Sequence, residues 1–228
     1  MNNALRSRRF VAAFLLLLAA GAGIFMAPDF WRSSAAPVSE SSVAGDATVA
    51  LDSLEVKGRA PKTGYTREQF GGDWEKVKGC DTRNIILARD LENETVNERC
   101  QVTGGVLNDP YTGETIHFQR GADTSDDVQI DHVVALSDAW QKGAQQLTFE
   151  ERVALANDPL ELLAVSGPAN QQKSDGDAAT WLPSQKTFRC QYVARQIAVK
   201  KKYTLWVTAA EKDAMKRVLS ACPGQTMP

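Results

Sequence analysis

The sequence predicts an α+β fold with several helices, few and short strands, and two disulfides. Two capping-box patterns, at Thr148–Glu151 and Thr208–Glu211, mark the starts of helices. Residues 114–120 alternate between apolar and polar side chains, which is typical of a half-buried strand. The chain carries four cysteines, an even number that permits disulfide pairing outside the cytoplasm.

The N-terminal residues have the pattern of an export signal. Three arginines among residues 6–9 precede an apolar run over residues 10–27. A basic segment followed by an apolar one is typical of a signal peptide, so we expect one over residues 1–27. The run is also nearly long enough to span a membrane, so residues 10–27 are alternatively an uncleaved anchor. Either reading places the rest of the chain outside the cytoplasm, secreted or tethered to a membrane.

Composition divides the remaining chain into a linker and one domain. Residues 28–50 are rich in Ser, Ala and Pro and show no apolar period. We therefore expect a flexible linker over residues 28–55. The 228 residues suffice for one compact domain plus tails, and we place that domain at residues 56–224.

The first half of the domain is expected to contain short elements around one turn. Gly71-Gly72 should end a helix that begins at Thr66. Asn108–Gly113 has the composition of a turn. The expected elements are helices over 66–70, 82–91 and 137–142, and strands over 99–106, 114–120 and 128–134.

The second half is expected to be mainly helical. Thr148 caps a helix that reaches about Ala156, and Thr208 caps the last helix. Pro183 suits the first turn of a long helix that reaches about Lys201. Between these helices we expect a short apolar strand or turn over 160–165 and another helix over 168–173.

The cysteines lie at positions 80, 100, 190 and 222, which allows three disulfide pairings. We favour Cys80–Cys100 and Cys190–Cys222, because each bond closes a modest loop within one region. A zinc site is the alternative. It is disfavoured because the sequence has no CxxC pair and no histidine near a cysteine.

Charge is distributed unevenly along the chain. The formal net charge is −2, but residues 170–228 carry ten basic and four acidic side chains, and residues 33–169 are strongly acidic. A nucleic-acid partner would therefore be met mainly by the C-terminal quarter. In the alternative reading these basic residues only solvate helix faces.

The chain has two histidines. His117 is opposite in phase to Ile116 and Phe118, so we expect it to face solvent. His132 follows Asp131 in a β-rich run, and adjacent strand residues point to opposite faces. Asp131 could then face a metal ion while His132 faces a water molecule. The alternative is a core histidine beside a surface aspartate.

Residues downstream of this pair extend the pattern. Asn157 precedes a short apolar segment, and Lys173 follows three residues after Asn170. The order Asp-His, Asn, Asn-x-x-Lys resembles the HNH (ββα-metal) endonucleases. Residues 60–222 are similar to exported bacterial HNH proteins related to the C-terminal domain of the GmrSD modification-dependent restriction enzymes. The blocks that carry this wider similarity are residues 80–84, 88–91, 129–136 and 175–183.

The resemblance implies a ββα-metal core, also called a His-Me finger, with additional helices. It implies that Asp131 and Asn170 hold one divalent cation, expected to be Mg²⁺ with Mn²⁺ as the alternative. His132 would be the general base and would act in its neutral form near its ordinary pKa. Asn157 would hold His132 in place through the loop backbone. Lys173 would contact a phosphate or the charge of the transition state.

Two parts of this assignment stay open. Asn170 lies thirteen residues after Asn157, so Asp175 and Asp177 are alternative second ligands, unless they only form an exposed turn. Four basic residues are expected to bind substrate, and the alternative is that they form ion pairs or lie on the solvated surface. They are Arg83, Arg89, Lys186 and Arg189.

These expectations combine into a secreted, monomeric, metal-dependent endonuclease that hydrolyses nucleic acid. We expect DNA rather than RNA, little sequence specificity, and no protein partner. The first alternative is a non-catalytic extracellular interaction domain that is stapled by disulfides and keeps the fold. The second is a metal-dependent hydrolase of another phosphoester.

Overall fold

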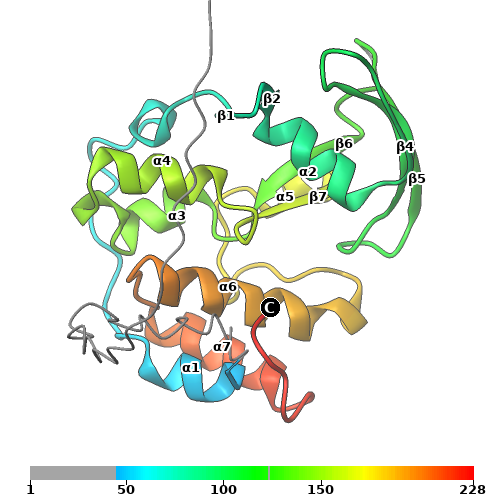
Figure 1. Ribbon diagram of the computed structural model, residues 1–228. Helices are drawn as coiled ribbons and strands as arrows, with labels where there is room; N and C mark the ends of the chain where they lie inside the picture. Colours follow the sequence, from blue (N-terminus) through cyan, green and yellow to red (C-terminus); the bar gives the residue numbers. More distant parts are fainter. Residues whose placement is uncertain (1–44, 123) are drawn as a thin grey trace, which may run out of the picture. The chain divides into compact units, whose positions relative to one another are not determined.

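The computed structural model describes residues 45–122 and 124–228 (Figure 1). The expected signal peptide or anchor and the linker up to residue 44 lie outside these residues. Within the described part of the chain, no helix is both long enough and apolar enough to span a membrane.

The described residues form a mixed α+β structure with short strands, as predicted. Its helices are α1 Ala47–Ser53, α2 Thr82–Asp90, α3 Leu136–Gln141, α4 Phe149–Asn157, α5 Gly167–Lys173, α6 Arg189–Lys202 and α7 Ala209–Leu219. Its 3-10 turns are η1 Arg67–Phe70, η2 Ala144–Gln146 and η3 Lys186–Phe188. Its strands are β1 Lys76–Val77, β2 Cys80–Asp81, β3 Glu92–Val96, β4 Val102–Asn108, β5 Thr115–Gln119, β6 Val128–His132 and β7 Leu162–Ser166.

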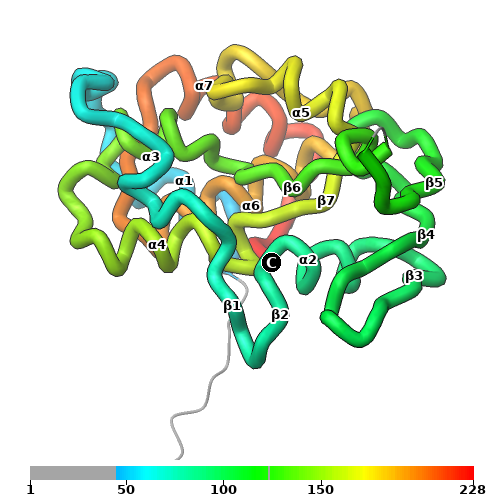
Figure 2. The backbone as a smooth tube through the Cα atoms, turned by 90° about the horizontal axis from the view of Figure 1, so that it is seen from above, coloured from blue at the N-terminus to red at the C-terminus, as the bar shows by residue number. Residues whose placement is uncertain are grey.

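All strands pair antiparallel, in the sheets β1–β2, β3–β4–β5 and β6–β7. Strands β6 and β7 lie side by side, with α2 and α5 packed against them (Figure 2). In their register Asp131 is opposite Leu163 and His132 is opposite Leu162. Cross-strand partners share a face of the sheet, so Asp131 and His132 point to opposite faces, as expected.

The two faces of β6–β7 pack into different hydrophobic cores. Ile130 and Leu162 belong to a smaller core that includes residues of α2, β4 and β5. Leu163 and Val165 belong to a larger core with residues of α1, α6 and α7. Because both faces are packed, the sheet is a rigid platform for the residues at its end.

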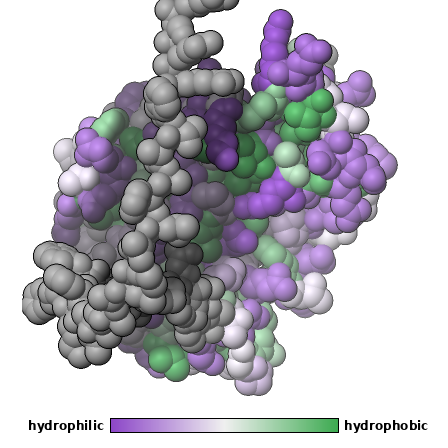
Figure 3. Space-filling view, viewed as in Figure 1, coloured by the Kyte–Doolittle hydropathy of each residue, from purple (hydrophilic) through white to green (hydrophobic). Residues whose placement is uncertain are grey.

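Exposed large apolar side chains are few among the described residues. They come from different elements and loops: Val49, Val56, Val77, Val96 and Phe149. In the view of Figure 3, hydrophilic residues predominate over the side that carries β4 and β5. Scattered single apolar side chains are normal on a protein surface.

Helix α1 corrects the predicted linker over residues 28–55. Asp46 caps this helix by accepting hydrogen bonds from the backbone N–H groups of Thr48 and Val49. Ala47, Ala50 and Leu51 are fully or almost fully buried, and α1 contacts α6 and α7. Residues 47–53, which the sequence assigned to the linker, are therefore part of the folded domain. The apolar residues of α1 at i, i+3 and i+4 are a helical signal. This signal is masked because the surrounding residues have a composition typical of a linker.

Helix α6 begins at Arg189, not near Pro183 as predicted. The backbone N–H of Gln185 and the hydroxyl of Ser184 both donate to the Tyr111 carbonyl, at 2.9 and 3.0 Å. These contacts hold the segment against the turn after β4, so its backbone cannot enter a helix. Pro183 favours the start of a helix, but the sequence does not show the tertiary contacts that delay this start to Arg189.

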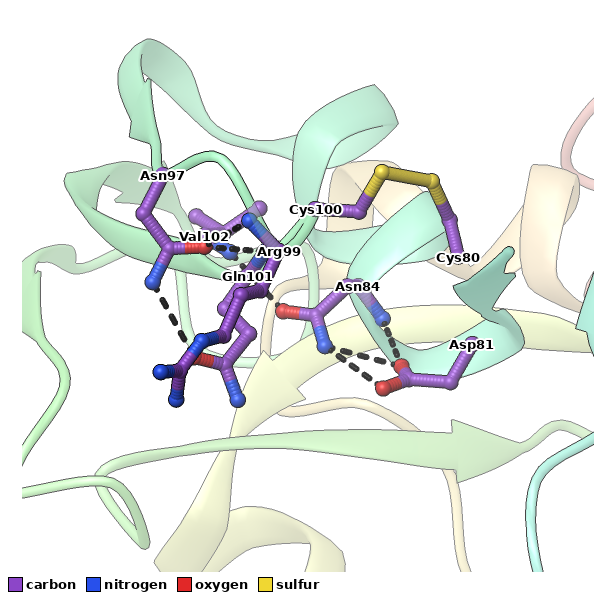
Figure 4. The surroundings of a disulfide bond; sticks show 8 residues. All are labelled: Cys80, Asp81, Asn84, Asn97, Arg99, Cys100, Gln101 and Val102. Carbon is purple, nitrogen blue, oxygen red and sulfur yellow. Dashed lines mark hydrogen bonds between the residues drawn. A yellow bond between two sulfur atoms is a disulfide. The ribbon is translucent and has the colours of Figure 1, made fainter. Parts of the chain in front are cut away.

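Both predicted disulfides are present. Cys80–Cys100 joins β2 to the turn after β3, and Cys190–Cys222 joins α6 to the segment after α7. Figure 4 shows the first bond beside Asn84, whose amide donates to Asp81. The Oδ1 atom of Asn84 accepts the backbone N–H of Val102 at 2.9 Å. The disulfide and these hydrogen bonds therefore fasten α2 to the β3–β4 hairpin.

We expect the double variant Cys190→Ala/Cys222→Ala to have a lower free energy of unfolding by about 3–4 kcal/mol, because the bond closes a loop with a sequence separation of 32 residues. Urea unfolding without reductant measures the loss. Treatment with reductant should destabilise the wild type by more than it destabilises the variant. A loss below about 1 kcal/mol would show that the loop constraint contributes little.

Candidate active site

A cleft of about 340 Å³ opens at the end of β6. Three residues that the resemblance assigns to the active site line it together: Asp131, His132 and Asn170. The strand β6 supplies the first two, and α5, which follows β7 directly, supplies the third. Other polar and charged residues of the lining are Lys62, Tyr65, Arg67, Ser137, Ser174 and Asp175.

Asp131 is buried and both of its carboxylate oxygens accept hydrogen bonds. Lys173 Nζ donates to Oδ1 at 2.8 Å, and the Tyr111 hydroxyl donates to Oδ2. Burial raises the pKa of Asp131, and the contacts with Lys173 and Tyr111 oppose this rise. The two donors fix the carboxylate at the floor of the cleft.

Lys173 lies beneath the site and not at its surface. Its side chain is 0% exposed, and Nζ also donates to the backbone carbonyl of His132 at 2.7 Å. A buried ammonium group that is already paired is poorly placed for the phosphate contact expected from the sequence. Its geometry is that of a positioning residue for Asp131 and for the end of β6.

His132 is held on the other face of the sheet. Its Nε2 lies 3.0 Å from the Ala156 carbonyl oxygen. A carbonyl only accepts, so Nε2 carries the hydrogen and Nδ1 keeps a lone pair. The ring stacks on Trp74, with centroids 5.6 Å apart and planes 6° apart. These contacts fix both the tautomer and the orientation of the imidazole.

The charge state of His132 differs from the expectation. Burial, with the nearby positive charges of Arg67 and Lys173, lowers its pKa to about 3. The ordinary pKa expected from the sequence is therefore wrong for the free protein, and the ring is neutral at physiological pH. An anionic phosphodiester bound beside the ring would raise this pKa, because a negative charge favours the imidazolium form.

Asn157 fastens the segment that carries Trp74. Its Oδ1 accepts the backbone N–H of Glu75 at 3.0 Å, and its amide donates to the Val153 carbonyl at 3.0 Å. Asn157, Trp74 and His132 line one small space. Asn157 therefore reaches His132 through the Trp74 segment and not by a direct hydrogen bond.

The three candidates for a second ligand lie in different settings. Asn170 donates through Nδ2 to Gln129 Oε1 at 3.0 Å, which fixes the amide and leaves Oδ1 without a hydrogen-bond partner among the described residues. Asp175 lines the cleft and pairs with Lys62 at 3.1 Å. Asp177 is buried, pairs with Arg59 and Lys142, and does not line the cleft. Asp177 is therefore excluded as a ligand at this site.

The four predicted substrate-binding residues do not line this cleft. Arg89 pairs with Asp90 and donates to the backbone carbonyls of Pro159 and Leu162. It therefore has the alternative role considered above, that of an ion-pair partner. Arg83 is partly buried and donates to the Ser125 carbonyl. Lys186 and Arg189 line a separate cleft of about 460 Å³ between α6 and α7.

Several residues of the site had no signal in the sequence. Lys62, Tyr65 and Arg67 come from the loop and the 3-10 turn before β1, far from Asp131 along the chain. Tyr111 comes from the turn that follows β4, and Trp74 comes from the segment before β1. Isolated residues of these types carry no motif, and only the folded chain brings them to the cleft.

Glu161 is a second buried acid close to the site. It is 0% exposed, and both of its carboxylate oxygens accept from the backbone N–H of Val134 at 3.2 Å. Burial is the main cause that raises its pKa well above the usual value. The folded state therefore holds a proton on Glu161 more tightly than the unfolded state does.

This shift predicts a dependence of stability on pH. A folded-state pKa above the unfolded value contributes stability at low pH, and this contribution is lost as the pH rises from about 4.5 through the folded pKa. Glu161→Gln keeps the shape of the protonated side chain and carries no charge at any pH, so we expect it to stabilise the protein at pH 8 relative to the wild type. Thermal unfolding between pH 4 and pH 8 measures this. The exposed Glu114→Gln is the control, and equal pH profiles for both variants would contradict the prediction.

The residues present fit a hard divalent cation. Asp131 and Asn170 offer oxygen donors to one cleft, and each Asp131 oxygen keeps a lone pair beyond its hydrogen bond. Among the described residues, no group of three His, Cys, Asp or Glu could hold a metal ion. A closed zinc site is therefore absent from this part of the chain, whereas an open site with two protein ligands suits Mg²⁺.

Known proteins resemble more than half of this chain. The family described as GmrSD restriction endonucleases, C-terminal domain, matches residues 81–218. A protein of Arthroderma benhamiae, described as an uncharacterized secreted protein, is 38% identical over 175 residues, which cover 75% of this chain and 82% of the relative. This relative is fungal, so the resemblance extends beyond the bacterial proteins expected. No solved structure matches the chain. The family match spans more than half of the chain and contains the Asp131-His132 pair, so the chain belongs to the family of GmrSD restriction endonuclease C-terminal domains.

Proposed function

We propose that this protein is an exported, metal-dependent HNH endonuclease that hydrolyses phosphodiester bonds of nucleic acid. The observation that carries the proposal is the state of His132. The bond to the Ala156 carbonyl and the stack on Trp74 hold a neutral imidazole whose Nδ1 has no hydrogen-bond partner among the described residues. The ring lies beside a cleft that also contains Asp131 and Asn170. This combination supplies a base and two oxygen ligands at one place.

The order of elements supports an HNH core. Strand β6 carries Asp131 and His132, β7 pairs with it, and α5 follows β7 directly and carries Asn170. Two antiparallel strands and a helix thus surround the proposed metal site. The family membership supports an endonuclease as well, because the family is named for restriction endonucleases.

The proposed mechanism assigns one task to each side chain. His132 accepts a proton from the attacking water at Nδ1, while Ala156 and Trp74 prevent rotation of the ring. Lys173 and Tyr111 orient the Asp131 carboxylate from below. Arg67 lines the cleft and is exposed, so it can contact the phosphate, the role that the buried Lys173 is poorly placed to fill.

A divalent cation, Mg²⁺ or alternatively Mn²⁺, would be held by Asp131 and Asn170. When bound, it would neutralise the phosphate charge and stabilise the leaving oxygen. Asp175 is the alternative second ligand, because it lines the same cleft. We expect DNA rather than RNA as substrate, cut with little sequence specificity, by a secreted monomer. The fungal relative is described as a secreted protein, which supports export.

A metal titration tests the proposal. We expect the protein to nick plasmid DNA in Mg²⁺, EDTA to stop nicking, and Asp131→Ala to lose both nicking and Mg²⁺ binding by calorimetry. Asp177→Ala serves as a comparison outside the cleft. The absence of cleavage in any divalent ion, with an intact fold, would favour a non-catalytic extracellular domain. Cleavage of a small phosphodiester without cleavage of DNA would favour another phosphoesterase.

A further inference from the structure

A second cleft of about 440 Å³ adjoins the first. Lys62 and Asp175 line both clefts, and the ion pair between them, at 3.1 Å, lies where the clefts meet. Both side chains of this pair are about half exposed. An exposed ion pair contributes little to stability, so a ligand that spans both clefts can displace it at low cost.

The second cleft combines one exposed lysine, Lys62, with a rigid aromatic wall. Arg59 and Lys173 also line it, but each is already paired with a buried aspartate. Asp175 is the one acid of the lining. Trp181 forms the aromatic part of the lining. Further polar groups come from Gln141, Gln172 and Thr180. This composition suits an anionic ligand with flat rings better than it suits an apolar ligand or a cation.

Trp181 is fixed close to the catalytic centre. Its ring packs edge-on against Tyr111 and Tyr192, with centroids 4.9 and 5.8 Å apart. Tyr111 also donates to Asp131, so one side chain connects the Trp181 ring to the proposed metal ligand. The indole N–H donates to Gln172 Oε1 at 3.5 Å. Trp181 is only partly buried, and part of it lines the second cleft.

We propose that the second cleft binds an unpaired nucleotide next to the scissile phosphodiester. Lys62 exchanges Asp175 for a phosphate, and the base stacks on Trp181. The inference rests on the proposed function, because it names the form in which nucleic acid enters the site. Inside a duplex both faces of a base are covered by its neighbours, so stacking on a side chain requires a single-stranded or opened segment.

A pair of charge variants at Gln172 tests this subsite without touching the catalytic residues. Gln172 is exposed and lines the second cleft but not the first. Binding of a labelled single-stranded oligonucleotide is measured by fluorescence anisotropy in EDTA, so no cleavage occurs. We expect Gln172→Glu to raise Kd by about threefold to tenfold and Gln172→Lys to lower it, as one charge near a phosphate should.

Gln171 provides the matched control. It is the exposed neighbour on α5, and it lines neither of the two clefts. Gln171→Glu should change Kd by less than about twofold at 0.15 M salt, because exposed charges are screened. Equal effects of the two glutamate variants would overturn the proposal. An effect of Gln172→Glu on duplex binding as large as on single-strand binding would also overturn it.

Trp181 supplies an independent signal. We expect its fluorescence to be quenched when the oligonucleotide binds, and Trp181→Phe to remove this quenching and weaken binding by up to about tenfold. Unchanged quenching in Trp181→Phe would overturn the stacking contact. These readouts separate the two proposals. If the protein cleaves DNA but the Gln172 and Trp181 variants bind the oligonucleotide like the wild type, only the subsite is refuted. If these variants change binding as predicted but the wild type cleaves nothing, only the nuclease activity is refuted.

Discussion

His132→Ala is expected to lower the rate of phosphodiester cleavage by about 10²–10⁴-fold, the usual contribution of a general base. The reason is that Nε2 donates to the Ala156 carbonyl, whereas Nδ1 of the neutral ring has no partner in residues 45–122 and 124–228 and can accept a proton. Initial rates of plasmid nicking in saturating Mg²⁺ measure the effect. Mg²⁺ binding should persist, because Asp131 and Asn170 remain.

His117→Ala is the matched control for this prediction. His117 is exposed on β5 and does not line the cleft. The His117→Ala variant should therefore cleave DNA at the rate of the wild type. Because the His132 ring packs on Trp74, His132→Asn is a second variant that fills more of the space. Full activity in a folded His132→Ala or His132→Asn protein would refute the role of this residue as base.

Lys173→Met is expected to lower the free energy of unfolding by about 3–5 kcal/mol, as the loss of one partner of a buried ion pair usually does. The substitution leaves the Asp131 carboxylate buried with only Tyr111 as a side-chain donor, and removes a hydrogen bond to the His132 carbonyl. Methionine retains most of the side-chain volume, so the loss reports charge and not packing. Urea unfolding in EDTA measures it.

Lys62→Met breaks the exposed pair with Asp175 and should cost at most about 1 kcal/mol. The double variant Lys173→Met/Asp131→Asn removes both buried charges, so it should recover part of the stability lost in Lys173→Met. A loss in Lys173→Met no larger than that in Lys62→Met would show that the buried pair is not structural. Activity should fall in Lys173→Met as well, because the Asp131 carboxylate would no longer be fixed.

The elements that the sequence predicted well are those with local signals. The capping boxes at Thr148 and Thr208 are formed by both side-chain and backbone contacts, and the helices begin where expected. By contrast, β3 was not predicted. All five of its residues are exposed, so it has no apolar period, and only its pairing with β4 defines it as a strand.

The candidate site was predicted only in part, for a physical reason. A motif shows which residues are near in sequence, but charge pairing depends on distant segments. Asp175 and Asp177 are two positions apart, and yet one lines the cleft while the other joins a buried network with Lys142 and Glu211. Lys173 was assigned the role of a phosphate contact, but its side chain is buried beneath Asp131. No local pattern distinguishes these outcomes.

The two ends of the folded unit are joined to each other. Asp46 forms a β-bridge with Thr226, and the N–H groups of Ala47 and Met227 donate to the carbonyls of Gln225 and Gly45. Domains with adjacent ends tolerate circular permutation and insertion into other chains. This unit is therefore suited to insertion into a surface loop of a carrier protein, because its adjacent ends would not force the two ends of that loop apart.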